Sequence, residues 1–324
     1  MLEFVSRVCR NQLSGKGRAR SAAVMVMAAT LAGVGLAATP ASASPGPTEF
    51  QVGTFNMGGG AEEGQDSRDE DDPFAAVSAL QASVEDRDPA FITVQEACED
   101  WMNELDARLG GYTIAFDPVT GSSGDTANCK NSDGEDVAPF GNAVIYRDDL
   151  GIDAAQTQAY SLQTPGDREN REMLCVHTAT TDGLAVCSVH LTPGGGDDAD
   201  AREREARVAT QHLEYKQSQG YTVFAGGDLN GTPSSDALDQ FYDAGYARGA
   251  EGAFKEVDSP CGNTIASGYW VWPGFYAPCR AGESTQGISK IDFMFVDPSV
   301  TVRSADATSA EYSDHDPLWA DVTL

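Results

Sequence analysis

Short apolar segments with strand-like alternation recur along the chain, and helical periodicities separate some of them. Residues 50–56 alternate apolar and polar positions, as a strand with one buried face does. The segment 91–96 is mostly apolar, has the length of a strand and ends in Gln95 and Glu96. Further strands are predicted at residues 142–146, 172–177, 184–191, 221–225, 291–296 and 318–324.

Helical patterns lie between several of these strands. Asp72 and Pro73 supply a cap and a first turn for a helix through about residue 86, with its apolar positions on one face. A charged helix is expected over residues 198–217, and a weaker one near 100–109 precedes a long Gly/Ser/Asp-rich loop. Hairpins interspersed with helices predict an α/β sandwich with mixed sheets rather than a purely parallel, doubly wound fold.

The N-terminal segment has the pattern of an export signal. Five basic residues precede a run of small and apolar residues at 22–38, and an Ala-Ser-Ala site follows at 41–43. The run is shorter than the roughly 20 strongly apolar positions of a spanning helix. We therefore expect a signal peptide over residues 1–43, a mature domain over 44–324, secretion to the extracellular space, no stable membrane insertion, and a monomer.

Cysteine usage agrees with export, because Cys9 leaves with the signal and six cysteines remain. Six cysteines allow 15 connectivities, and pairing between sequence neighbours is preferred. A five-residue turn at 179–183 would pair Thr178 with Leu184 and hence, stepping outward, two flanking cysteines. No cysteine has the spacing of a zinc site. The predicted disulfides are Cys98–Cys129, Cys175–Cys187 and Cys261–Cys279.

Charge limits the partners that the chain attracts. The formal net charge is −29, and removing the signal, with five of the 21 basic and one of the 50 acidic residues, leaves −33. Such a field repels nucleic acid and anionic lipid at long range, so a polyanionic substrate has to be held by local contacts and bound divalent ions. Most of the acids are interpreted as solubilising surface. A structural Ca²⁺ in the acidic loop 62–72 is a minor hypothesis, because the spacing does not match an EF-hand.

Polar side chains repeatedly appear where predicted strands end. Carboxylate and amide oxygens are the ligands that Mg²⁺ or Mn²⁺ prefers, and a histidine beside a carboxylate is suited to take a proton from water. Together they describe metal-assisted hydrolysis of a phosphate ester. These residues are Asn56, Glu96, His190, Asp228, Asn230, Asp292, Asp314 and His315.

Seven ordered motifs surround these residues: Thr54-Phe55-Asn56, Val94-Gln95-Glu96, residues 142–147, Val189-His190-Leu191, residues 227–230, Lys290-Ile291-Asp292-Phe293 and residues 313–317. Through them the mature chain resembles the endonuclease/exonuclease/phosphatase superfamily, also called deoxyribonuclease I-like. The resemblance implies a four-layered α/β sandwich of two facing β-sheets with helices outside. It also implies a requirement for a divalent metal.

Residue chemistry and the resemblance together assign a role to each candidate. His315 is interpreted as the general base, with Asp292 fixing its tautomer. Asp228 would orient the attacking water, Asn230 would hold a phosphoryl oxygen, and His190 would stabilise charge on the phosphorus or help the leaving group. The expected metal ligands are Glu96, Asn56 and Asp314, and the expected substrate contacts are Asn230, Arg171 and Tyr146.

One position departs from the superfamily's secreted pancreatic branch. That branch pairs the histidine equated with His190 with a carboxylate, and Phe140 stands at this place here, although the neighbouring Asp136 or Glu135 could substitute. Arg171-Glu172 resembles the Arg-Glu of the nuclease branch. Arg171 is equally well interpreted as a surface arginine paired with an acid.

These features predict a secreted, divalent-metal-dependent phosphodiesterase, first of all an endonuclease acting on DNA or RNA. The alternatives are a phospholipid phosphodiesterase of the sphingomyelinase kind, a small-molecule or inositol phosphate phosphatase, and an inactive binding module. The aromatic segment 269–276 is either a packed loop core or a platform for bases or lipid. His177 and His212 are interpreted as structural.

Overall fold

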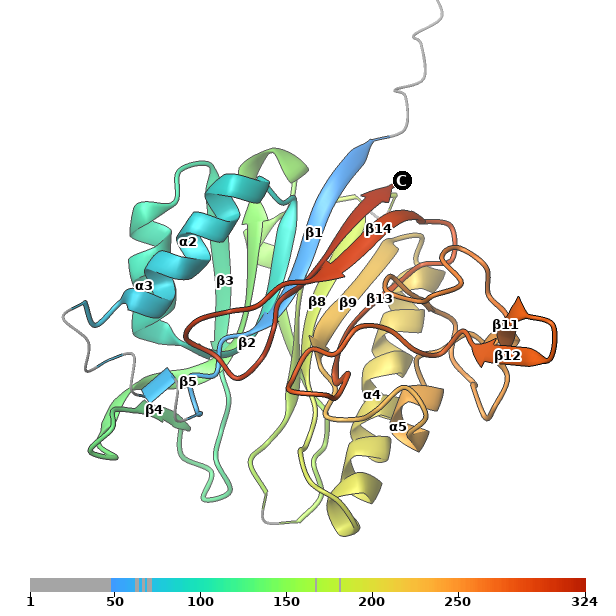
Figure 1. Cartoon of the computed structure of the whole chain (residues 1–324). Helices are drawn as coiled ribbons and strands as arrows, with labels where there is room; N and C mark the ends of the chain where they lie inside the picture. The colour runs from blue at the N-terminus through green and yellow to red at the C-terminus, as the bar shows by residue number, and fades with distance from the viewer. Residues whose placement is uncertain (1–47, 62–63, 66–67, 69–71, 167, 181) are drawn as a thin grey trace, which may run out of the picture. The chain divides into compact units, whose positions relative to one another are not determined.

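The computed structural model describes residues 48–61, 64–65, 68, 72–166, 168–180 and 182–324 (Figure 1). They all belong to one unit, which spans residues 45–324. The predicted signal peptide and most of the acidic loop 62–72 lie outside the described residues. No helix in the described ranges has both the length and the apolar character needed to cross a lipid bilayer.

Two mixed sheets form the centre of the fold. The first has the order β14 (Thr301–Ala307), β15 (Leu318–Thr323), β1 (Glu49–Asn56), β2 (Phe91–Cys98), β5 (Asp136–Arg147) and β3 (Tyr112–Pro118), and β4 (Asn128–Lys130) pairs with β5. The second has the order β10 (Lys255–Glu256), β13 (Asp292–Val296), β9 (Thr222–Asp228), β8 (Leu184–His190), β7 (Glu172–His177) and β6 (Gln158–Ser161). Within each sheet one central pair is parallel, β1 with β2 and β8 with β9.

Helices cover the outer faces of the two sheets (Figure 1). Helices α2 (Ala75–Arg87) and α3 (Glu99–Arg108) share an apolar cluster with the first sheet, and α4 (Asp197–Ser218) and α5 (Asp236–Asp239) share one with the second. A third cluster, including Val52, Phe91 and Phe224, lies between the sheets. The predicted four-layered sandwich is confirmed. Short 3₁₀ turns occur at Asp148–Leu150, Ala154–Gln156 and Ala244–Tyr246.

The predicted helix after Asp72 illustrates how sequence signals are used locally. The carboxylate of Asp72 accepts hydrogen bonds from the Phe74 nitrogen at 2.9 Å and from Ser78 Oγ at 3.2 Å. The helix itself begins at Ala75, so Asp72 caps the turn that leads into it. Val77, Leu80 and Val84 are buried against the first sheet, as their spacing predicts.

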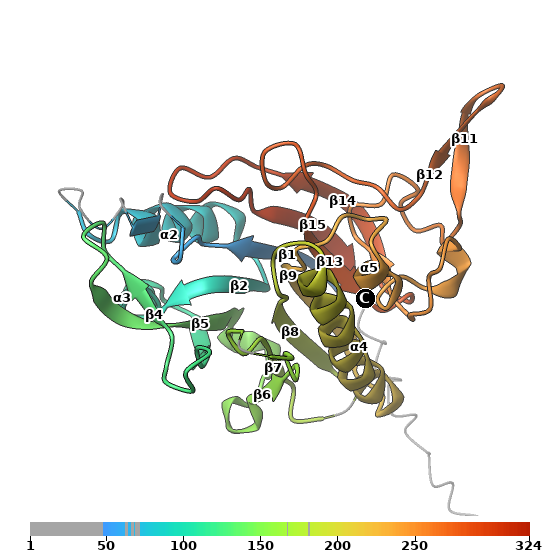
Figure 2. The same cartoon turned by 90° about the horizontal axis from the view of Figure 1, so that it is seen from below.

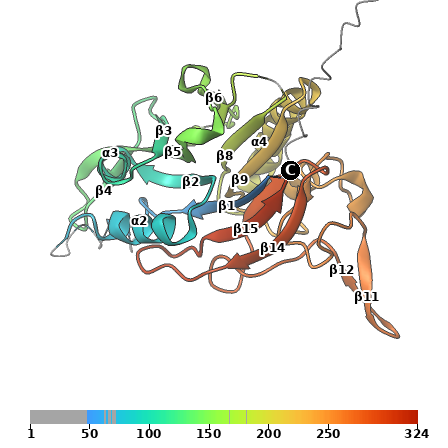
Figure 3. The ribbon, with the colours of Figure 1, turned by 90° about the horizontal axis from the view of Figure 1, so that it is seen from above.

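Several strands were not apparent from the sequence. The segment expected as a long Gly/Ser/Asp-rich loop contains β3 and β4, which pair with β5. Nearly every residue of β3 is half-buried, so the strand lacks the alternation that would have revealed it. The strands β6, β10 and β14 were likewise missed. The hairpin of β11 (Gly268–Trp272) and β12 (Phe275–Pro278) forms a separate sheet and projects from the other layers (Figures 2 and 3).

The three disulfides pair as the sequence predicts. Cys98 at the end of β2 is bonded to Cys129 on β4. Cys175 and Cys187 lie directly opposite each other on β7 and β8, whose hairpin also pairs Thr178 with Leu184. The third bond, Cys261–Cys279, joins the two ends of the segment that contains the projecting hairpin.

Candidate active site

The edge where the parallel strands end carries most of the predicted site residues. Asn56, His190 and Asp228 are the last residues of β1, β8 and β9. Asp292 begins β13, and because β13 runs antiparallel to β9 it lies directly opposite Asp228. These strand ends border a cleft of about 300 Å³. Seven predicted residues line it: Glu96, Arg171, His190, Asp228, Asn230, Asp314 and His315.

His315 and Asp292 form a buried pair. His315 Nδ1 lies 2.8 Å from Asp292 Oδ2, and the two residues are 4% and 1% exposed. Burial alone would lower the pKa of His315, but the hydrogen bond and charge of Asp292 raise it to about 9. In the neutral form of His315, Nδ1–H donates to Asp292 and the lone pair of Nε2 faces the cleft. This is the arrangement of a general base.

Asn56 connects two carboxylates at the base of the cleft. Its Nδ2 donates to Glu96 Oε1 at 3.2 Å and to Asp228 Oδ2 at 3.1 Å. Its Oδ1 accepts from the Gly58 nitrogen at 2.9 Å. Asn56, expected as a metal ligand, turns its amide nitrogen toward the two carboxylates and its amide oxygen toward the backbone. By donating to both carboxylates, Asn56 fixes the position of Glu96 relative to Asp228.

A local irregularity of β2 aims Glu96 into the cleft. The pairing of β2 with β5 shifts between Val94 and Ala97, and Glu96 has a φ of 50°. A bulge of this kind redirects a side chain at the rim of a sheet. The Gly60 nitrogen donates to Glu96 Oε2 at 3.0 Å, and a Cβ on Gly60 would lie 2.9 Å from the same oxygen. Glycine at this position lets the backbone approach the carboxylate without displacing it.

Asp228 is the most central carboxylate of the cleft. Its Oδ1 accepts from the Asn230 nitrogen at 2.9 Å, and its Oδ2 accepts from Asn230 Nδ2 at 3.1 Å. Asp228 Oδ2 also lies 3.8 Å from His315 Nε2 and 3.5 Å from His190 Nε2. Burial and the charge of Asp292 raise the pKa of Asp228 to about 7. Asn230 lines the cleft as predicted and orients Asp228.

His190 is paired with an arginine. Arg171 Nη1 lies 3.0 Å from His190 Nδ1 and 3.4 Å from Nε2, and the same Nη1 is 3.0 Å from Glu169 Oε1. A guanidinium can only donate, so the closer nitrogen, Nδ1, is the acceptor and Nε2 carries the proton. Burial and the charge of Arg171 hold the pKa of His190 well below its usual value. His190 is therefore a neutral donor.

The carboxylates expected to substitute at the Phe140 position do not do so. Phe140 itself lines the cleft. Asp136 pairs with Lys130 at 2.6 Å, and Glu135 accepts from Asn131 at 3.3 Å. Their side chains are exposed on the β4–β5 hairpin, because β5 continues past the cleft to pair with β4. Glu169 lines the cleft and pairs with Arg171, which in turn contacts His190.

Tyr146 is not a substrate contact. It is 3% exposed and lies in the apolar cluster between the sheets. Because β5 is antiparallel to β2, its C-terminal end pairs with the beginning of β2, and Tyr146 is opposite Phe91. The cleft lies at the other end of these strands. His177 and His212 are structural as predicted: His177 contacts Tyr221, and His212 packs on Tyr160.

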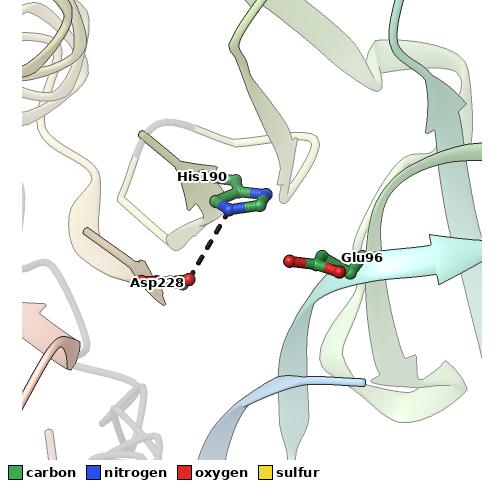
Figure 4. Close-up of side chains that lie close together, drawn as sticks. All are labelled: Glu96, His190 and Asp228. Carbon is green, nitrogen blue, oxygen red and sulfur yellow. Dashed lines mark ion pairs between the residues drawn. The ribbon is translucent and has the colours of Figure 1, made fainter. Parts of the chain in front are cut away.

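The donor set of the cleft fits a divalent cation. Within the described part of the chain, two groups of ligand atoms lie within 4.8 Å of one another: Glu96 with His190 and Asp228, and Asp228 with Asp292 and His315. Asp292 Oδ1 is also buried with no hydrogen-bond partner among these residues. Several close carboxylates with little compensating charge favour a hard cation held by oxygen ligands. Figure 4 shows Glu96, His190 and Asp228 facing a common space.

Asp314, the third expected ligand, belongs to neither group. Its Oδ2 accepts a hydrogen bond from Gln286 Nε2 at 2.7 Å, and that nitrogen also lies 3.0 Å from His315 Nε2. Gln286 was not predicted, because it comes from a loop with no periodic signal. Gly60 could have been found from its place in the three glycines that follow the first strand. Glu169 could have been found as an acid two residues from Arg171.

Comparison with known proteins identifies the family. The sequence model of the Endonuclease/Exonuclease/phosphatase family matches residues 53–315. The chain belongs to this family. Members are phosphoester hydrolases and generally depend on divalent metals. By family the chain is a hydrolase. No match was found among curated proteins.

Solved structures of low sequence identity share the fold. The catalytic domain of human Nocturnin with bound sulfate has a TM-score of 0.57 at 16% identity, covering 87% of this chain and 99% of that one. TDP2 of D. rerio, complexed with a single-strand DNA product, has a TM-score of 0.53 at 15% identity, covering 86% and 100%. A mannosyl-6-phosphatase of Bacteroides thetaiotaomicron has a TM-score of 0.54 at 15% identity, covering 85% and 100%. The fold therefore serves several substrate types and does not by itself select one.

Proposed function

We propose that this protein is exported and hydrolyses phosphodiesters with a divalent cation, acting first of all on DNA or RNA. The observation that carries the proposal is the buried Asp292–His315 pair, in which His315 Nε2 faces the same cleft as the carboxylates of Glu96 and Asp228. A general base beside a cation site can activate water for attack on phosphorus.

The residues divide the chemistry as follows. A cation held by Glu96 and Asp228 would neutralise charge on the phosphoryl oxygens. His315 Nε2 accepts a proton from water as the new P–O bond forms, and Asp292 stabilises the resulting imidazolium. His190 donates its Nε2–H toward the phosphoryl or leaving oxygen as the ester bond breaks. Asp228 lies between the two histidines and orients the water.

Two observations support a nucleic acid substrate. Arg171 lines the cleft, where a guanidinium can contact one phosphate of a strand. A structural neighbour, TDP2, was solved with a single-strand DNA product. A phospholipid substrate is the second candidate, and the observation in its favour is the exposed aromatic hairpin of β11 and β12. The strongly acidic charge of the chain also disfavours tight binding of a long polyanion.

The test is direct incubation of the purified protein with four substrates: plasmid, RNA, sphingomyelin vesicles and inositol phosphates. We expect cleavage of plasmid or RNA with Mg²⁺ or Mn²⁺, none with excess chelator, and none with a His315→Ala variant. Intact nucleic acids beside hydrolysed lipid would replace the first candidate by the second. If no ester is cleaved with either metal, the proposal is wrong.

A further inference from the structure

The segment between Cys261 and Cys279 has an unusual composition for this chain. No residue from 262 to 278 is charged, whereas 22% of the whole chain is. The segment contains the hairpin of β11 and β12, and the disulfide joins its two ends. Figures 2 and 3 show this hairpin, in orange, standing away from the two central sheets. It is therefore an uncharged projection on an otherwise acidic protein.

The hairpin exposes aromatic side chains on both faces and at its tip. Trp270 is 69% exposed and its neighbour Tyr269 is 38% exposed, and consecutive residues of a strand point to opposite faces. At the tip, Trp272 is 58% and Phe275 is 47% exposed. Soluble proteins rarely leave a contiguous aromatic surface of this kind in water, and where they do it marks an interaction site.

The hairpin is held in shape by its own contacts. Trp272 and Phe275 are paired across a two-residue turn in which Gly274 has a φ of 92°, as a Pro-Gly type II turn requires. Their rings stack with centroids 4.6 Å apart, and the Trp270 and Tyr276 rings meet edge to face at 5.2 Å. The exposed rings thus lose little conformational freedom when they bind.

The chemistry of the hairpin selects one kind of partner. A single-strand binding platform combines aromatic rings with cationic side chains, and residues 262–278 offer no cation. A folded protein that docks on one face would leave the other face in water. A lipid–water interface takes up both faces and the tip together, and Trp and Tyr are the side chains that favour this region. The net charge of −29 repels strongly anionic membranes and so favours a zwitterionic surface.

We propose that the β11–β12 hairpin seats this protein on zwitterionic phospholipid surfaces, with Trp270, Trp272 and Phe275 entering the headgroup region. The inference does not depend on the proposed hydrolysis, because seating requires neither the cation nor His315. If the phosphodiester substrate proves to be a lipid, the hairpin is the element that brings the enzyme to it.

The test is sedimentation of the purified protein with phosphatidylcholine vesicles in chelator, so that binding is measured without hydrolysis. We expect binding that changes little between low and high salt, accompanied by a blue shift of tryptophan fluorescence. Burial of a large aromatic side chain contributes on the order of a tenfold change in affinity. A Trp270→Ser/Trp272→Ser variant should therefore bind at least tenfold more weakly. A Tyr215→Ser variant, which removes a 64% exposed ring on α4, should bind like the wild type.

Three outcomes would overturn the inference: no binding to phosphatidylcholine vesicles, equal binding by the double variant, or stronger binding to vesicles of phosphatidylglycerol. Loss of single-stranded DNA binding in the double variant, with vesicle binding unchanged, would instead assign the hairpin to nucleic acid.

A Trp272→Asp variant provides a second test, because a charge at the tip of the hairpin should abolish vesicle binding. Hydrolysis of bis(p-nitrophenyl) phosphate by both variants at the wild-type rate would confirm that they fold. Failure of the wild type to hydrolyse this diester and the four substrates named above would contradict the proposed function and leave the vesicle result standing.

Discussion

The two cleft histidines lie at the same edge of the sheets and have opposite electrostatic surroundings. His315 and His190 are each 4% exposed, and each places Nε2 within 4 Å of Asp228 Oδ2. Nδ1 of His315 faces the carboxylate of Asp292, whereas Nδ1 of His190 faces the guanidinium of Arg171. The pKa of His315 is therefore raised and that of His190 lowered. Similar burial with different partners separates a proton acceptor from a neutral donor.

The largest effect is expected from removing the base. A His315→Ala variant loses both the proton acceptor and the imidazolium charge, so kcat/KM for a phosphodiester should fall about 10³-fold or more. A His177→Ala variant, which removes a buried histidine outside the cleft, is the matched control and should stay within a fewfold of the wild type. Equal losses in the two variants would mean that the effect is one of folding and not of catalysis.

Removing the charge of Asp292, the carboxylate partner of His315, is expected to have the next largest effect on kcat/KM. An Asp292→Asn variant should lose roughly 10²-fold in kcat/KM, because the tautomer and the imidazolium are no longer stabilised. Asp292 raises the pKa of His315, so the variant's rate should begin its rise at lower pH than the wild type's. Asp297→Asn, a change just past the other end of β13, is the control. An unchanged pH profile in Asp292→Asn would show that Asp292 does not tune His315.

Removing Arg171, the partner of His190, is expected to have a smaller effect on the rate. It should raise the pKa of His190, whereas removing Asp292 should lower the pKa of His315. An Arg171→Met variant removes the charge that disfavours protonation of His190, so the pKa of His190 should rise toward its ordinary value. We expect about a tenfold loss of kcat, with an added decline of the rate toward acid pH. Arg168→Met, which breaks the ion pair with Asp198, is the matched control. A change in KM alone would make Arg171 a substrate contact only.

The stability of the cation-free protein should fall as pH rises. Asp228, Glu172 and His315 have pKa values raised to about 7, 8 and 9, so each binds its proton more tightly in the folded state. Such a contribution is complete below the unfolded pKa and is lost as pH passes the folded pKa. The melting temperature in chelator should therefore decline from about pH 7 to pH 9, above the range in which the lowered pKa of His190 acts in the opposite direction. Mg²⁺ should raise it more at pH 8 than at pH 5, and an equal rise at both would argue against a cation at Asp228.

The smallest effect concerns a carboxyl outside the cleft. Burial and the charge of Asp117 raise the pKa of Glu172, so this residue is protonated in the folded protein at neutral pH. A Glu172→Gln variant keeps the neutral form, so its melting temperature should exceed the wild type's by a few degrees at pH 9 and match it at pH 5. Glu251→Gln, on an exposed loop, should change neither. A destabilised Glu172→Gln protein at pH 9 would contradict the assignment.

The sequence was most informative where strand ends coincide with polar residues. Asn56, His190 and Asp228 could be placed together because each stands at the end of a predicted strand, and the loops at one edge of a sandwich bring side chains into one site. Tyr146 was misplaced, since only the pairing register shows that its end of β5 lies opposite the cleft. The contact of Arg171 with His190 and the contacts of Gln286 also escaped prediction. Both side chains come from segments between regular elements, whose position depends on packing of the whole domain and not on a local pattern.

The most direct test of the division between the two histidines is an NMR titration of the imidazole nitrogens in the cation-free protein. The chain has only four histidines, so His315→Ala and His190→Gln variants suffice to assign the two signals. We expect His315 to stay protonated until about pH 9 and His190 to stay neutral, with its proton on Nε2, down to well below its ordinary pKa. Titration of both near their ordinary value, or in the reverse order, would contradict the assignment of His315 as base and His190 as donor.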